Sequence, residues 1–472
     1  MVFKRRRWGI AVISLLLVFI LHRWLPGFAN MPLAEPLPQD PYIQVYLNQS
    51  QANTYQDPYR GIKRYGDDLE AVIVDAIAQA QTSIDVAVQE INLPQIALAL
   101  RDRAQAGVTV RIVIENQYNR VWQPLSDFQA HKLDDRQSSK HAEQEQMIDA
   151  NHNGKITARE LDQGDAIRIL QKAPIPLIDD TADGSKGSGL MHHKFLVVDG
   201  KTVLLGSANL TLSGLHGDFA HPDSRGNANA LLKIESAELA SVLGQEFALM
   251  WGDGPKGKED SLFGLQKPQR SPQTVSIPGS AVTVQFSPTS ESKPWSQSVN
   301  GLISRTLAQA NQAVDLALFV FSDQGIANTL AQKSEAGVTV QALVDANFIY
   351  RSYSEALDML GTATPDHRCQ LEANNRPWKQ PIAQVGTPAL PVGDKLHHKF
   401  ALIDNETVII GSHNWSAAAN HNNDEDLLVI RNPTVAAHFR REFNRLMTDA
   451  QLGMHPDLRD RLQRQRKQCG LP

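Results

Sequence analysis

Two blocks of the chain repeat the same order of apolar and polar positions. The apolar, β-branched runs 83–91 (SIDVAVQEI) and 313–321 (AVDLALFVF) each predict a strand that is buried on both faces of a sheet. Each run leads into a helical pattern, a turn at Gly107 or Gly337, and a second apolar strand. Repetition of this unit predicts a duplicated α/β sandwich.

The repetition extends to the elements on either side of these blocks. Helices are predicted upstream, at 67–80 and 299–310, which completes the β-α-β rhythm. Downstream, each half has two short strands joined by a tight turn, the pattern of a β-hairpin. These hairpins are 195–198 with 202–205, joined by Asp199-Gly200, and 400–403 with 407–410, joined by Asp404-Asn405.

The hairpins carry the most specific signal, a motif that is present twice with one spacing. The segments HHKFLVVDGKTVLLGSANLT, from His192, and HHKFALIDNETVIIGSHNWS, from His397, both read His-x-Lys-x4-Asp-x6-Gly-Ser-x-Asn. Its residues are His192, Lys194, Asp199, Ser207 and Asn209 in the first copy, and His397, Lys399, Asp404, Ser412 and Asn414 in the second. Because side chains alternate along a strand, the histidine and lysine of each copy project from the same face.

This set of residues suits the cleavage of a phosphodiester without a metal or another cofactor. A neutral imidazole can attack phosphorus, and a protonated one can protonate the leaving oxygen. Lysine and asparagine side chains can neutralise and orient the non-bridging oxygens, where charge builds in the transition state. Two copies that meet face to face would supply two of each group around one phosphate. Since both copies lie on one chain, a monomer can hold the complete site.

From about residue 40 to 450 the chain resembles the phospholipase D superfamily, whose members carry this motif twice. The resemblance implies two α/β/α lobes with the active site at their pseudo-two-fold interface. It also implies that His192 and His397 are the nucleophile and the general acid/base. By the same resemblance, Lys194, Lys399, Asn209 and Asn414 bind phosphate, Ser207 and Ser412 line the site, and Asp199 and Asp404 are structural.

The two halves differ at one informative position. Glu425 stands where the family has a carboxylate that orients a catalytic histidine, whereas aligning LLKI with LLVI places Asn229 at the corresponding position of the first half. A carboxylate behind a histidine fixes its tautomer and raises its basicity. In related two-copy enzymes this support crosses between halves, so His192 is the expected nucleophile.

A second motif lies inside the insert 120–189, which has no counterpart of similar content in the second half. Residues 149–160 (DANHNGKITARE) match the EF-hand loop, and helical flanks are predicted at 138–148 and 158–162. The predicted Ca²⁺ ligands are Asp149, Asn151, Asn153, Lys155 and Glu160. With two carboxylates and no partner hand, the site should be weak, with a Kd of roughly 10⁻⁴ to 10⁻³ M. A polar turn between two helices is the alternative.

Length and composition divide the chain into two lobes with flanking segments. A chain of 472 residues can hold two ordinary domains. The predicted parts are an N-terminal segment 1–30, a first lobe 40–255, a linker 256–272 rich in Gly, Pro and charge, a second lobe 273–450 and a charged tail 451–472.

The N-terminal segment predicts export or membrane anchoring. Four basic residues, 4–7, precede the apolar run 8–21. The run is shorter than the roughly 20 residues of a membrane span, so a cleaved signal and an uncleaved anchor both stay open. Cys369 and Cys469 fit the periplasm, cell envelope or extracellular space, either as one disulfide or as two unrelated thiols.

Together these features favour a phospholipase D-type phosphodiesterase that hydrolyses or transfers phospholipid head groups at a membrane surface, through a phosphohistidine. The alternatives are an exported nuclease, a phosphatidyltransferase of the cardiolipin synthase kind, and a catalytically silent binding module. The net charge of -5 gives no overall basic surface, so a nucleic-acid partner would need a local patch. The intact second copy of the motif disfavours the silent module.

Overall fold

The computed structural model describes residues 33–471 and contains the two predicted α/β halves. The N-terminal segment 1–30, expected to be a signal or an anchor, lies outside the described residues. Within residues 33–471, no helix is both long enough and apolar enough to cross a membrane.

The first half is built on a seven-stranded mixed sheet. Its order is β1-β9-β8-β7-β4-β5-β6. The strands are β1 (Ile43–Leu47), β9 (Ala230–Glu235), β8 (Thr202–Gly206), β7 (Lys194–Val198), β4 (Ser83–Val88), β5 (Thr109–Ile114) and β6 (Leu177–Asp179). A separate ribbon joins β2 (Thr54–Gln56) to β3 (Lys63–Tyr65).

The second half repeats this sheet and adds one strand at each edge. Its order is β10-β11-β19-β17-β16-β12-β14-β15-β20. The strands are β10 (Gln273–Ile277), β11 (Ser280–Ser287), β19 (Glu425–Arg431), β17 (Thr407–Gly411), β16 (Lys399–Ile403), β12 (Ala313–Leu318), β14 (Thr339–Val344), β15 (Val385–Thr387) and β20 (Gln451–Leu452). Another pair joins β13 (Phe321–Ser322) to β18 (Trp415–Ser416).

The duplication holds at the level of strand register. In the first half, β4 runs parallel to β5 and antiparallel to β7, with Val88 opposite Lys194. In the second, β12 runs parallel to β14 and antiparallel to β16, with Leu318 opposite Lys399. Lys194 and Lys399, which begin the motif strands β7 and β16, therefore lie beside the carboxyl ends of β4 and β12.

Helices cover both faces of each sheet, as the continuous apolar strands require. The first half has α2 (Leu69–Ala78), α3 (Pro94–Gln105), α4 (Asp127–Ala130), α5 (Asp135–Ile148), α6 (Ala158–Gly164), α7 (Ala166–Lys172), α8 (Leu212–Leu215) and α9 (Ala237–Trp251). The second has α10 (Val299–Leu307), α11 (Gln324–Glu335), α12 (Glu355–Met359), α13 (Ala417–His421), α14 (Pro433–Met447) and α15 (Pro456–Gln468). Short 3₁₀ turns stand at Asn116–Tyr118, Ala182–Gly184, Gly264–Gln266 and Trp295–Gln297.

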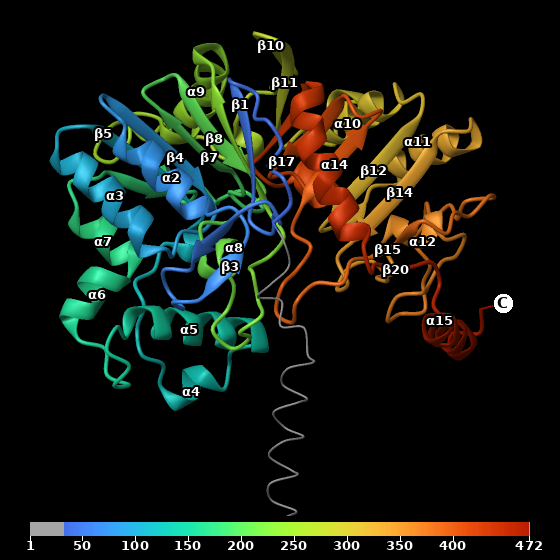
Figure 1. The fold of residues 1–472 in the computed structure, drawn as a ribbon, viewed down its shortest axis with the longest axis horizontal. Helices are drawn as coiled ribbons and strands as arrows, with labels where there is room; N and C mark the ends of the chain where they lie inside the picture. The colour runs from blue at the N-terminus through green and yellow to red at the C-terminus, as the bar shows by residue number, and fades with distance from the viewer. Residues whose placement is uncertain (1–32, 472) are drawn as a thin grey trace, which may run out of the picture.

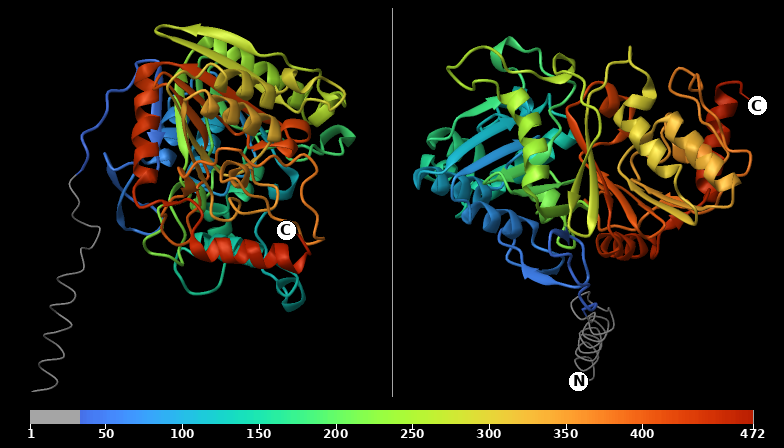
Figure 2. Two further views of the ribbon diagram at one scale, coloured as in Figure 1. Left: turned by 90° about the vertical axis from the view of Figure 1, so that its right-hand side faces the viewer. Right: turned by 90° about the horizontal axis from the view of Figure 1, so that it is seen from above.

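The two halves lie side by side and share one hydrophobic core (Figures 1 and 2). That core contains Phe195 and Phe247 from the first half together with Phe400 and Phe439 from the second. Isolated β-bridges also join the halves, between Met191 and Asp424 and between Ala228 and Leu396. Because the core is continuous, the residues at this junction are held by both halves.

Two predicted strands are shorter than their apolar runs. The run 83–91 forms a strand only to Val88, because the next residues leave the sheet and Ile91 pairs instead with Leu210. The run 313–321 likewise ends as a strand at Leu318, and Phe321 joins Trp415 in the small second pair. The predicted helices 67–80 and 299–310 are formed over Leu69–Ala78 and Val299–Leu307.

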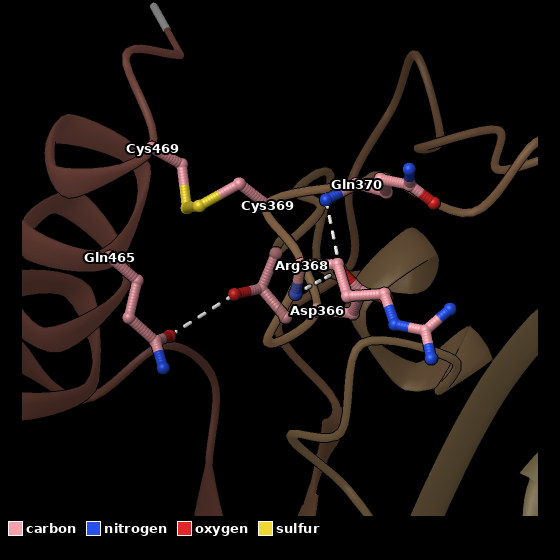
Figure 3. Close-up of a disulfide and its surroundings, with 7 residues drawn as sticks. Asp366, Arg368, Cys369, Gln370, Gln465 and Cys469 are labelled. Carbon is pink, nitrogen blue, oxygen red and sulfur yellow. Dashed lines mark hydrogen bonds between the residues drawn. A yellow bond between two sulfur atoms is a disulfide. The ribbon is translucent and has the colours of Figure 1, made fainter.

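A disulfide joins Cys369 to Cys469, with 5.2 Å between their Cα atoms (Figure 3). It connects the end of α15 to the irregular segment that precedes β15 in the second half. Of the two possibilities left open by the sequence, the structure has the paired cysteines.

Candidate active site

The two motif histidines meet at the junction of the halves, where each is held by main-chain hydrogen bonds from the other half. The backbone N–H of His192 donates to the carbonyl of Asp424 at 2.9 Å. The backbone N–H of His397 donates to the carbonyl of Ala228 at 3.1 Å. These contacts place the side chain that follows each acceptor, Glu425 or Asn229, behind the histidine of the opposite half.

The imidazole rings have unlike partners. Nδ1 of His192 lies 2.6 Å from Oε2 of Glu425, whereas Nδ1 of His397 lies 2.9 Å from Oδ1 of Asn229. Both partner oxygens accept, so each histidine carries its proton on Nδ1 and has none on Nε2. Glu425 is further held by the amide of Asn423, which donates to its Oε1 at 3.1 Å.

The motif serines lie behind these partners. The Ser207 hydroxyl donates to Oδ1 of Asn229 at 2.8 Å and accepts from the N–H of Ala230. The Ser412 hydroxyl accepts from the N–H of Asp426. Burial raises the pKa of Glu425, and a side-chain hydrogen bond from Ser412 opposes part of that rise. Both serines are fully buried, so they orient the histidine partners rather than line an open surface.

The two motif lysines lie beside the histidines. Nζ of Lys194 donates to the carbonyl of His192 at 2.7 Å and to Oε1 of Gln89 at 3.4 Å. Nζ of Lys399 donates to the carbonyl of His397 at 2.9 Å and lies 3.3 Å from its Nε2. The ammonium group of Lys399 and Nε2 of His397 therefore lie next to each other.

Burial sets the protonation of these four groups. The exposed fractions are 6% for His192, 4% for Lys194, 9% for His397 and 1% for Lys399. Burial and the nearby lysines hold the pKa of both histidines well below the ordinary value of 6.5, so both rings are neutral. Burial also lowers the pKa of Lys194 to about 8, while burial and Lys194 hold that of Lys399 well below its ordinary value.

Each motif asparagine has a side-chain oxygen that accepts no hydrogen bond from the described residues. Oδ1 of Asn209 and Oδ1 of Asn414 are buried and have no hydrogen-bond partner among the described residues. Each asparagine lies three residues after the end of a motif hairpin, β8 or β17. A buried polar group without a partner is costly unless a ligand or water completes it, so these amides are suited to hydrogen-bonding a substrate.

The junction brings together one motif histidine and one motif lysine from each half, close enough for both lysines to lower the pKa of both rings. Residues 73–251 and 303–447, more than half of the chain, match the protein family described as "Cardiolipin synthase, PLD-like domain". The chain belongs to this phospholipase D family.

Curated relatives match a smaller part of the chain. Mitochondrial cardiolipin hydrolase of Mus musculus is 26% identical over 155 residues, which are 33% of this chain and 61% of the relative. The Homo sapiens protein of the same name is 26% identical over 153 residues, 32% of this chain and 52% of the relative. The chain thus spans about half to three fifths of the length of these relatives.

A solved structure matches nearly the whole chain. The phosphatidylserine synthase of Haemophilus influenzae Rd KW20 superposes with a TM-score of 0.53 and 14% identity, over 89% of both chains. At this identity the likeness shows the shared fold. It agrees with the duplicated α/β architecture expected from the repeat.

The motif aspartates of this phospholipase D chain lie away from the histidines. Asp199 accepts from the N–H groups of Gln81, Thr82 and Ser83, and Asp404 accepts from those of Asn311, Gln312 and Ala313. Each thereby fixes the turn that leads into β4 or β12. These backbone donors lower the pKa of Asp199 to about 2 and also lower the pKa of Asp404.

The motif glycines are required by close strand packing. A Cβ atom on Gly206 would lie 2.1 Å from the carbonyl oxygen of Ala230, and one on Gly411 would lie 2.2 Å from that of Asp426. A larger residue would push the hairpin away from β9 or β19. The serine and asparagine that follow would then lose their positions.

Sequence reasoning missed a second, buried layer of ionisable residues. His193 lies 3.2 Å from Asp426 and 3.5 Å from Glu246, and His398 lies 2.9 Å from Glu442. Glu246 and Glu442 occupy corresponding positions of α9 and α14. The repeated His-His doublet and the repeated Glu-Phe pairs at 246–247 and 442–443 were the available signal.

A second missed pair fixes the residues before the motif histidines. Glu115 accepts from the N–H of Met191 at 2.7 Å, and Asp345 accepts from that of Leu396 at 2.9 Å. Each acid directly follows a parallel strand, β5 or β14. Burial raises the pKa of Glu115 to about 7.

Proposed function

We propose that this chain is a metal-independent phosphodiesterase that attacks a phospholipid head-group ester with His192 and protonates the leaving oxygen with His397. The observation that carries the proposal is the cross-half contact of 2.6 Å between His192 and Glu425. An ionised carboxylate stabilises the positive charge that develops on an attacking imidazole, whereas an amide does not. His397 has only the amide of Asn229 at this position.

In the first step, Nε2 of His192 attacks phosphorus, and the bond from phosphorus to the leaving oxygen breaks. The proton for that oxygen comes from Nε2 of His397. Burial makes His397 neutral in the free protein, so a bound phosphodiester anion must first raise its pKa. In the second step, His397 takes a proton from water or an alcohol, which displaces His192 and gives the product phosphate ester.

The remaining motif residues act on the phosphoryl oxygens. Lys194 and Lys399 supply positive charge in a site with very little solvent, where an electrostatic contact is stronger than in water. Asn209 and Asn414 supply the amides that lack partners in the free protein. The buried lysines regain a favourable environment only when the anion binds, which favours binding of an anionic ester.

A phospholipid is the proposed substrate class. The curated relatives are named cardiolipin hydrolases, and the matching family is described as cardiolipin synthase-like. An apolar surface adjoins the site: the ring of Phe319 lies 4.8 Å from that of His397 and 4.7 Å from that of Phe348. Both phenylalanines are partly exposed, which suits the apolar part of a lipid.

The test compares lipid vesicles with nucleic acid. Full-length protein in EDTA should release phosphatidic acid from vesicles of cardiolipin or phosphatidylcholine, and His192→Ala should not. Degradation of single-stranded DNA without lipid turnover would replace this proposal with the nuclease. Lipid turnover that requires glycerol or another alcohol, rather than water, would identify a phosphatidyltransferase.

We also propose that the protein acts outside the cytoplasm, at a membrane. Support comes from the basic and apolar pattern of the first 30 residues and from the Cys369–Cys469 disulfide. Disulfides persist in oxidising compartments and are rare in the cytosol. Fractionation of cells that make the full chain tests this, and recovery in the cytosol with free thiols would contradict it.

A further inference from the structure

The insert of the first half contains a helix–loop–helix whose loop presents oxygen atoms at regular positions. Helix α5 ends at Ile148, and α6 begins at Ala158. Oδ2 of Asp149 accepts from the N–H of Gly154 at 2.7 Å, and Gly154 has the left-handed φ of 72°. Thr157 and Glu160 form a reciprocal capping box, so the carboxylate at the last position returns toward the loop.

The loop holds two carboxylates that are almost fully buried. Asp149 is 7% exposed and Glu160 is 8% exposed. Among the described residues, neither carboxylate has a salt bridge to lysine, arginine or histidine. Buried carboxylates are ordinarily paired with a cation or bound to a metal, because an isolated buried charge is costly. The loop also carries Asn151 and Asn153, whose side-chain amides can offer neutral oxygen ligands.

We propose that residues 149–160 bind one Ca²⁺ ion, and that the bound ion holds α5 against the segments around Glu90 and Ser213, which adjoin the active site. The ligand set is Asp149, Asn151, Asn153, the main-chain carbonyl of Lys155 and Glu160. These are all oxygen ligands, as Ca²⁺ prefers, and they include no nitrogen or sulfur that would favour a transition metal. Asn151, which now donates to Glu160 at 2.5 Å, must turn its amide oxygen toward the ion.

Helix α5 contacts two segments of the first half through ionisable side chains. Nζ of Lys140 lies 2.6 Å from Oε2 of Glu90, and Oε1 of Glu143 accepts from the N–H of Ser213 at 3.3 Å. In Figure 1, α5 lies below the sheet of the first half, on the same side as α8, to which Ser213 belongs. The C-terminal end of α5, at Ile148, leads directly into the loop at Asp149.

These two segments carry residues of the active site. Gln89, which accepts from Lys194, directly precedes Glu90, and Asn209 lies four residues before Ser213. The segments are also bonded to each other, since the N–H of Leu210 donates to the carbonyl of Glu90 at 3.1 Å. An ion that fixes the end of α5 therefore restricts the surroundings of Lys194 and Asn209. The effect of this restriction on catalysis rests on the proposed function, whereas the ion site and its contact with these segments do not.

Calorimetric titration of the full chain with CaCl₂ tests the site directly. A single weak site should be seen, with a Kd on the order of 10⁻⁴ to 10⁻³ M. Glu160→Gln should weaken binding at least about tenfold, because it removes the bidentate carboxylate while Gln preserves the capping box. Glu335→Gln, an exposed carboxylate on α11 of the other half, is the matched control and should bind as the unchanged protein does. Absence of binding at about 10 mM Ca²⁺, well above the expected range, overturns the site.

Hydrogen exchange without substrate tests whether the bound ion affects the segment around Ser213, which adjoins the active site. Ca²⁺ should slow exchange at the Ser213 amide and along α5, and it should have no such effect in Glu160→Gln. Binding without a change at Ser213 would overturn the link to the active site while leaving the ion site in place. Because neither measurement involves turnover, a failure of the proposed enzymatic activity cannot produce either negative result.

Discussion

Oε2 of Glu425, on β19 of the second half, lies 2.6 Å from Nδ1 of His192 in the first half. The pseudo-symmetric position behind His397 is occupied by Asn229 at 2.9 Å. The two halves thus give their histidines the same tautomer but different charge behind the ring. The proposed mechanism assigns attack to His192 on this difference, because only that ring has a carboxylate behind it to balance the charge it would acquire.

The first prediction concerns the covalent intermediate. With a bis-(p-nitrophenyl) phosphate substrate, whose leaving group needs no acid, His397→Ala should accumulate a phosphoryl-enzyme on His192. His192→Ala should form none, and both variants should turn over lipid at least about 10²-fold more slowly. Acid-labile phosphohistidine can be located by mass spectrometry. A phosphoryl group found on His397 in His192→Ala contradicts the assignment.

The second prediction exchanges the two partners. Glu425→Gln should lower kcat by about 10²-fold, because the attacking ring loses its stabilising anion. Asn229→Asp alone adds a second buried carboxylate and should not increase the rate. The double variant Glu425→Gln/Asn229→Asp reverses the asymmetry, so its trapped phosphoryl group should move to His397. A group that stays on His192 would show that features other than this pair choose the nucleophile.

The third prediction is that kcat/KM falls at alkaline pH because Lys194 loses its charge. Burial lowers the pKa of Lys194 to about 8, so the free protein carries this charge below that pH and loses it above. The profile of kcat/KM, which reports the free protein, should fall as pH rises through about 8. Lys194→Arg keeps its charge at this pH, so its falling limb should lie at higher pH even if its rate is low. An unchanged limb in that variant would exclude Lys194 as its source.

A fourth prediction concerns a buried ion cluster between the halves. Nζ of Lys267 pairs with Glu246 of α9 and lies 2.8 Å from Asp424 of the second half, and the three side chains are fully buried. Lys267→Met should lower the free energy of unfolding by roughly 3–5 kcal/mol, because two carboxylates remain buried without this cation. Lys258→Met is the control, since Lys258 is exposed and lies 3.7 Å from Asp253. Equal urea midpoints for the two variants would contradict this account.

The sequence predicted the elements whose pattern is local. The apolar runs around Val86 and Leu316 specify buried strands, and the turns at Asp199 and Asp404 specify hairpins, so each motif copy could be placed at the start of a hairpin strand. Their equal spacing also predicted the two-fold arrangement of histidines and lysines.

Features that depend on docking of the halves were not predictable in the same way. Lys267 lies in a segment rich in Gly, Pro and charge, which indicated a linker, and its ammonium group is buried between the halves. Its partners come from α9 and from the residue before β19, and no local pattern connects these three places. Strand β1 was also overlooked, because it gains its partner β9 only after more than 100 residues of chain have folded back.

The last prediction concerns the disulfide at the end of the chain. Helix α15 is held by Leu458 and Leu462, which pack on Leu357, by a hydrogen bond between Thr364 and Gln465, and by Cys469 (Figure 3). The bond closes a separation of 100 residues, so it removes much conformational freedom from the unfolded chain. Reduction should therefore make α15 accessible to protease, whereas kcat should not change, because these contacts involve no motif residue. Cys369→Ser/Cys469→Ser should show the same protease sensitivity without reductant, and a loss of turnover in that variant would show that α15 supports the active site after all.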